Sequence, residues 1–211
     1  VPHEHELGPL APGEHTLALC IDNSFQPTPG DNHQVSEHTQ GNWNGVLGRM
    51  DLRALPPVRI EHVAVAPDLA ARALRLRIRL SGTPSIPPTG SLSIAAESCN
   101  HTGAPHRPAP LSVPLTPETA PAGEIAVTLP LGPDAKLWDE FSPALYRLAL
   151  RLDTPAGSAE STLTTGLREF RARATQFAIN GRTTFLRGEV NCGVFPLTGH
   201  TPMDVAGWRV Y

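Results

Sequence analysis

The sequence predicts a mainly β protein, built as an antiparallel sandwich and followed by one β/α unit. The first observation is a period of two, because Leu74, Leu76, Ile78 and Leu80 alternate with three arginines. Such alternation is typical of a strand with one buried and one solvated face. The second observation is that Pro- and Gly-rich clusters separate many short stretches of this kind. The third is that no convincing helix precedes residue 201, so together these patterns indicate a sandwich.

The strands can be placed one after another between the turn clusters. Pro56–Pro57 marks a boundary, because two prolines form a stiff connector that cannot sit inside a sheet ladder. Turns are expected at Gly82–Pro88, Gly103–Pro110, Pro130–Pro133 and Pro155–Gly157. The predicted strands are His15–Asp22, the strand-like Arg49–Leu55, Arg59–Ala66, Leu74–Leu80, Ser91–Glu97, Glu124–Leu129, Tyr146–Leu152 and Ser161–Thr165.

A different pattern begins near Gly166. Asn180–Gly181 within Phe177–Arg182 is the signal of a hairpin with a type I′ turn. A buried strand is expected at Thr184–Val190, and a helix is expected to start with Thr201 as its N-cap, Pro202 at its first position and Asp204 three residues after the cap. Strand, loop and helix in this order are the unit of an α/β barrel or a doubly wound sheet.

Composition excludes several classes of function. The 211 residues carry a net charge of −3, which does not favour nucleic acid or an anionic membrane as a partner. The three cysteines are far apart and form neither a disulfide framework nor a zinc motif. No apolar run is long enough to span a bilayer. We therefore expect no metal and no cofactor in this chain.

Several short motifs between residues 137 and 188 occur in a recognisable order. They are Leu137–Trp138, Ser142–Pro143–Ala144–Leu145–Tyr146, Thr165–Gly166–Leu167–Arg168–Glu169–Phe170, Phe177–Ala178–Ile179–Asn180–Gly181–Arg182 and Phe185–Leu186–Arg187–Gly188. In this order the motifs resemble glycoside hydrolase family 2, the family of β-galactosidases, β-glucuronidases and β-mannosidases. The run from His38 to Arg49 and the pair Asp22–Asn23 resemble the family's N-terminal jelly-roll domain.

The resemblance implies three domains. Residues 1–56 would be the C-terminal part of a jelly-roll sugar-binding domain, 57–166 an immunoglobulin-like β-sandwich, and 167–211 the start of a (β/α)8 catalytic barrel. The chain departs from the family after Asn191, where Cys192–Gly193–Val194–Phe195–Pro196 replaces the usual histidines and arginine. This departure suggests a divergent branch and leaves the sugar specificity open.

The implied activity is that of a retaining exo-β-glycosidase acting on terminal β-linked sugars. Its two catalytic glutamates would lie on later barrel strands, so the chain is expected to contain no catalytic residue and to be inactive alone. Carbohydrate is the expected partner, and homo-oligomerisation of the full-length enzyme is left open. The bacterial-looking composition does not decide between cytoplasm, periplasm and secretion. A non-catalytic carbohydrate-binding β-sandwich protein is the alternative that the strand pattern equally suits.

Six residues are candidates for substrate binding. Gln40, Asn42, Trp43 and Asn44 combine amides, which pair with hydroxyl groups, and an indole, which stacks on a sugar face. The other reading is a turn with Trp43 in the core. Asn191 and Cys192 follow the expected first barrel strand, at the end where barrel active sites lie. Glu189 lies on that strand, but we expect an arginine to hold it in a structural role.

Overall fold

The structure, a computed structural model, describes residues 3–22, 45–46, 49–82, 89–188, 195, 197–198 and 200–210. The chain divides into two compact units. One consists of Val1–Asp51 together with Glu189–Tyr211, and the other is Leu52–Gly188. Of the described residues, those in the second unit contain every strand, and that unit is described first.

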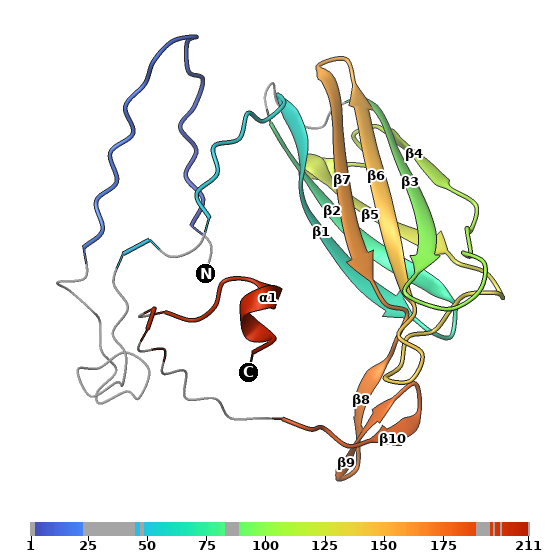
Figure 1. The fold of residues 1–211 in the computed structure, drawn as a ribbon. Coiled ribbons are helices and arrows are strands. Elements are labelled where there is room, and N and C mark those ends of the chain that lie inside the picture. The colour runs from blue at the N-terminus through green and yellow to red at the C-terminus, as the bar shows by residue number, and fades with distance from the viewer. Residues whose placement is uncertain are drawn as a thin grey trace. The chain divides into compact units, whose positions relative to one another are not determined.

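Seven strands of the second unit form two antiparallel sheets (Figure 1). One sheet has the order β1-β2-β5, and the other has the order β4-β3-β6-β7. This is the strand order of an immunoglobulin-like sandwich in which the fourth strand has joined the second sheet. The strands are β1 (Val58–Asp68), β2 (Ala73–Gly82), β3 (Gly90–Cys99), β4 (Leu111–Leu115), β5 (Glu124–Pro130), β6 (Leu145–Thr154) and β7 (Gly157–Thr165), with the 3-10 turn η1 (Pro121–Gly123) before β5.

The core lies between these two sheets and follows the period of two in the sequence. In β2, Leu74 and Leu76 are at most 1% exposed, whereas the intervening Arg75 lies on the solvent face. Tyr146 and Leu150 in β6 are buried to the same degree from the opposite sheet. Leu167, two residues after β7, is fully buried in the same cluster, so the chain leaves the sandwich through its core.

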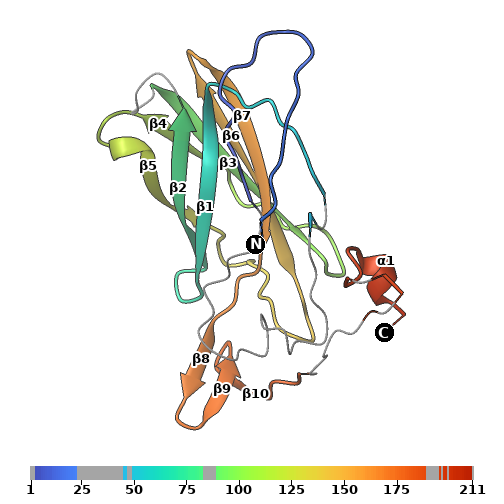
Figure 2. The same cartoon turned by 90° about the vertical axis from the view of Figure 1, so that its left-hand side faces the viewer.

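A third sheet follows the sandwich and is also antiparallel. It consists of β8 (Phe170–Arg173), β9 (Gln176–Ile179) and β10 (Arg182–Thr184), in the order β10-β9-β8. Figures 1 and 2 show it beyond the end of the sandwich at which β7 finishes. Asn180 and Gly181 have φ values of 51° and 80°, as a type I′ turn requires, which confirms the predicted hairpin.

Most predicted strands of the sandwich are confirmed to within a few residues, but one strand was not predicted and one expectation was wrong. Leu111–Leu115, for which no strand was predicted, pairs with β3. Proline is tolerated there because β4 is an edge strand that needs hydrogen bonds on one side only. The expected buried strand from Thr184 ends at Thr184, and Phe185 beyond it is 82% exposed; residues 189 and 190 lie outside the described residues.

The described residues of the other unit depart further from the expectations. His15–Asp22 and Arg49–Asp51 are exposed chain without strand pairing, as are residues 52–55 at the start of the second unit. The alternating Leu17, Leu19 and Ile21 are exposed, and no strand of the described residues pairs with this segment, so no ladder forms there.

The helix of this unit starts later than the sequence suggested. The helix α1 (Val205–Trp208) is capped by Asp204 rather than Thr201, and the Asp204 carboxylate accepts a hydrogen bond from the Gly207 amide at 2.7 Å. The Trp208 indole meets the Phe195 ring edge-on at 5.7 Å between centroids. Among the described residues no parallel strand pair occurs, so a barrel stays a prediction.

Candidate functional site

The six predicted substrate-binding residues lie outside the described residues. These are Gln40, Asn42, Trp43, Asn44, Asn191 and Cys192, and Glu189 lies outside them as well. Their proposed contacts with a sugar therefore stay predictions. The structure does describe the motifs from Trp138 to Gly188, and it brings most of them together where the sandwich meets the β8-β9-β10 sheet.

Trp138 lies at the centre of this junction. Its backbone N–H donates to the Leu167 carbonyl oxygen at 3.0 Å, and the Arg168 guanidinium lies over its indole at 4.6 Å from the centroid. A guanidinium in this position is attracted by the negative face of the ring. Gly166 lies against the same indole, because a Cβ there would come within 3.0 Å of the Trp138 Cβ. Trp138 and Gly166 are thus fitted to each other.

Asn180 connects the hairpin to the junction. Its Nδ2 donates to the Trp138 carbonyl oxygen at 2.9 Å, and its Oδ1 accepts from the Glu169 N–H at 2.9 Å. Its backbone N–H donates to the Glu169 carbonyl oxygen. The side chain thus makes two hydrogen bonds and the backbone a third, from a residue in the left-handed conformation, which asparagine tolerates better than most residues.

The loop after Trp138 makes a second connection. Glu140 accepts a hydrogen bond from the Thr184 hydroxyl at 2.9 Å and forms an ion pair with Arg182 at 3.4 Å. The Arg182 guanidinium also lies 4.4 Å from the centroid of the Phe141 ring. Within the loop, the Asp139 carboxylate accepts from the backbone N–H groups of Phe141 and Ser142, and these bonds lower the pKa of that carboxyl.

Tyr146, the last residue of the Pro-Ala-Leu-Tyr motif, is the centre of a buried polar network. Its hydroxyl accepts from the Lys136 N–H at 2.9 Å and lies 2.7 Å from the His106 Nδ1. Ser98, which is 2% exposed, accepts from the His106 N–H and lies 2.7 Å from the His101 Nε2. Burial raises the pKa of Tyr146, because it disfavours the phenolate.

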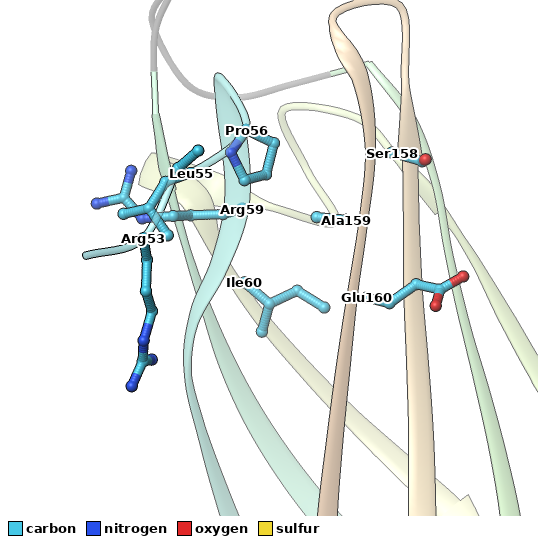
Figure 3. Close-up of a pocket in the computed structure, with 9 residues that line it drawn as sticks. Arg53, Leu55, Pro56, Arg59, Ile60, Ser158, Ala159 and Glu160 are labelled. Carbon is cyan, nitrogen blue, oxygen red and sulfur yellow. The ribbon is translucent and has the colours of Figure 1, made fainter. Parts of the chain in front are cut away.

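An open pocket of about 640 Å³ lies at the edge of the sandwich, between β1 with its preceding segment and β7. Figure 3 shows that Ile60 and Ala159 point toward each other across it, whereas the Glu160 carboxylate points away. Arg53 and Arg59 line the pocket, but their guanidinium groups also lie away from Glu160. Because the charged groups do not converge, this pocket offers no arrangement for acid–base chemistry.

Among the described residues, the carboxylates of Asp153 and Glu160 both bind Arg151, at 3.0 Å and 2.8 Å. The carboxylates raise the pKa of the Arg151 guanidinium, the Asp153 hydrogen bond contributing most. The three side chains are about half-exposed or more, so they form an ion-pair network on the surface of the sandwich. The part of the chain that the structure covers also contains no group of acidic, cysteine and histidine residues suited to a metal ion. None of its helices is long and apolar enough to cross a membrane.

Sequence reasoning found the motifs but not all of their partners. Glu140, His106 and Ser98 were not singled out, although each makes a contact that holds the junction or the network beside it. In the sequence, Glu140 is marked only by its closeness to Trp138, and Ser98 and His106 only by their closeness to the His101–His106 loop. This closeness does not reveal the contact of Glu140 with Thr184 or of His106 with Tyr146.

The fold is an antiparallel β-sandwich of immunoglobulin-like strand order, joined to a small antiparallel sheet. A β-glucuronidase from Parabacteroides merdae is similar in structure, with a TM-score of 0.49, 18% identity and coverage of 64% of this chain and 17% of that chain. β-Glucuronidases from Ruminococcus gnavus and Dictyoglomus thermophilum give TM-scores of 0.43 at 16% identity, covering 64% and 63% of this chain. The chain spans about a fifth or less of the length of these proteins. No family model and no curated protein matches the sequence.

Proposed function

We propose that this chain is part of a retaining exo-β-glycosidase similar to glycoside hydrolase family 2, which hydrolyses terminal β-linked sugars. One observation carries the proposal: the motif residues that resemble the family, spread over about 50 positions, meet at one junction. Gly166, Arg168 and Asn180 all contact Trp138 there, through side chains or backbone.

This convergence supports the proposal because each motif residue has a specific task at the junction. Gly166 provides room for the Trp138 indole, and Asn180 supplies both a turn conformation and two side-chain hydrogen bonds. Chance matches to short motifs would have no reason to contact each other across 42 positions. The motifs are therefore parts of one architectural unit, as expected where a sandwich joins a following domain.

In this proposal the chain has an accessory role. A retaining mechanism needs an acid/base and a nucleophile about 5–5.5 Å apart, and we assign neither role to a residue of this chain. The two glutamates would belong to a barrel that follows residue 167. Gln40, Asn42, Trp43 and Asn44 would contact the sugar from the jelly-roll side, and Asn191 and Cys192 from the barrel side.

The test is hydrolysis by the longer protein that the proposal requires. p-Nitrophenyl β-galactoside, β-glucuronide and β-mannoside are offered to it, and proton NMR follows the anomeric configuration of the first product. We expect release of p-nitrophenol from one substrate with a β-anomer as the first product, and no release by residues 1–211 alone. A folded longer protein that cleaves none of the three, or that yields the α-anomer first, would refute the proposal.

A further inference from the structure

Asn180 and Gly181, which form the turn between β9 and β10, are a chemically reactive pair. An asparagine before a glycine readily loses its side-chain amide, because the next backbone nitrogen attacks the asparagine Cγ and glycine has no Cβ to hinder the attack. The turn itself gives no steric protection, since a Cβ added to Gly181 would meet no atom within 4 Å. Any protection of Asn180 must therefore come from the contacts of its own side chain.

Two hydrogen bonds hold the reacting group of Asn180. Its Nδ2 donates to the Trp138 carbonyl oxygen and its Oδ1 accepts from the Glu169 N–H, each at 2.9 Å. Both atoms bonded to Cγ are thus held by partners from two other segments of the chain. The side chain must turn toward the Gly181 nitrogen for the reaction to occur, and this movement breaks both bonds. The reaction therefore has to wait for an opening of the junction.

We propose that Asn180 is a deamidation site that reacts only when the β8-β9-β10 sheet detaches from the loop at Trp138, and that the reaction makes this detachment permanent. Hydroxide removes the proton of the Gly181 N–H, and the nitrogen forms a bond to the Asn180 Cγ. The bond from Cγ to Nδ2 breaks, and the amide takes a proton from water and leaves as ammonia. Water then opens the cyclic imide at one of its two carbonyl carbons, which yields aspartate or isoaspartate at position 180.

Neither product can restore the original junction. In the aspartate product a carboxylate oxygen replaces Nδ2, so two acceptors face each other where the Asn180 donor meets the Trp138 carbonyl oxygen. The part-buried carbonyl then lacks a donor, which destabilises the closed state. In isoaspartate the backbone passes through Cβ, which lengthens the two-residue turn that the pairing of Ile179 with Arg182 requires. One opening followed by reaction is therefore irreversible.

A second contact resists the same opening without touching Asn180. Glu140 accepts a hydrogen bond from the Thr184 hydroxyl and pairs with Arg182, so it holds β10 against the loop that follows Trp138. The Glu140 side chain is 40% exposed, and its removal is therefore compatible with folding. Loss of this contact should make the junction open more often and speed the reaction of Asn180, although the reacting pair itself is unchanged.

The experiment is incubation of the 211-residue chain at neutral pH, in buffer and in urea, followed by trypsin digestion and mass spectrometry of the peptide Ala174–Arg182. We expect Asn180 to deamidate at least about tenfold more slowly in buffer, because an opening that breaks two hydrogen bonds is rare. Glu140→Ala should raise the rate in buffer about threefold or more. Glu160→Ala is the matched control, because it removes an exposed carboxylate paired with an arginine on the sandwich and should leave the rate unchanged.

Asn180→Asp supplies the product without the reaction, and it should lower the midpoint of urea unfolding at least as much as Asn180→Ala. If Glu140→Ala did not fold, Thr184→Val would take its place, because it removes only the hydroxyl that Glu140 binds. Four outcomes overturn the proposal: no reaction of Asn180 in urea, equal rates in buffer and urea, equal rates in Glu140→Ala and Glu160→Ala, and an Asn180→Asp chain as stable as the unchanged one. None of these readouts depends on glycosidase activity.

Discussion

The Asn180 Nδ2 donates a hydrogen bond to the Trp138 carbonyl oxygen at 2.9 Å, although the two residues are 42 positions apart. This bond joins the turn of the β8-β9-β10 hairpin to the loop that precedes β6. The same side chain accepts from the Glu169 N–H, so a single amide fixes the hairpin to the segment that precedes β8.

Replacing Asn180 should therefore weaken the junction. We expect Asn180→Ala to lower the free energy of unfolding by about 1–3 kcal/mol, since a part-buried carbonyl and an N–H lose their partners. Asn180→Gly is the control, because glycine keeps the left-handed turn but removes the side-chain bonds. Urea unfolding followed by tryptophan fluorescence measures both. If Asn180→Gly were as stable as the original chain, the turn conformation alone would matter.

Gly166 should not accept a side chain. A Cβ there would lie 3.0 Å from the Trp138 Cβ and 3.1 Å from its Cγ, so Gly166→Ala must displace the indole. We expect a loss of about 1–3 kcal/mol from overpacking, measured by thermal unfolding. Gly188→Ala serves as the control, since no atom lies within 4 Å of its added Cβ. Equal stability of the two variants would show that the indole moves without cost.

Tyr146 should make the chain sensitive to alkaline pH. Its pKa is raised by burial, so the folded state keeps the phenol protonated at a pH where the unfolded state has lost the proton. The corresponding stability is complete below about pH 10 and decreases as the pH rises through the folded pKa. Tyr146→Phe should flatten this decrease, measured as the free energy of unfolding from pH 8 to 11. A decrease of unchanged slope in Tyr146→Phe would assign it to other groups.

Two neighbouring residues in β2 should differ sharply in their effect. Leu76 is 1% exposed in the core, so Leu76→Ala is expected to cost about 2–5 kcal/mol. Arg77 is exposed and lies 4.0 Å from Glu124, and Arg77→Ala should change stability by no more than about 1 kcal/mol. Denaturant unfolding of both variants gives the comparison, and similar losses would contradict the assignment of the two faces of β2.

Much of the sandwich could be predicted because its strands have one buried and one exposed face, so apolar and polar residues alternate along them. The buried face can be read from the apolar positions of Leu74 to Leu80 in β2 and of Tyr146 to Leu152 in β6. The strand β4 could not be recognised, because Pro110 and Pro114 are turn residues except at a sheet edge, and edge position is a property of the whole topology.

The segments outside the sandwich were less predictable for a different reason. His15–Asp22 has strand composition, but a strand also needs a neighbour, and the described residues provide none. The helix start was predicted three residues early because Thr201 and Asp204 are both good caps, and the structure uses Asp204. The six candidate substrate-binding residues stay predictions. Contacts such as that of Glu140 with Thr184 could not be predicted, because they join residues 44 positions apart that only the fold brings together.

Leu167 is fully buried although it lies only two residues after β7. A pull on the chain from beyond this point therefore meets an apolar side chain that must be withdrawn from the core before the chain can extend. Tension that reaches Leu167 through the following sheet therefore loads the packed core before it loads the pairing of β6 with β7. The connection thus acts as a mechanical anchor, which transmits force between the two folded parts instead of yielding as a flexible tether would.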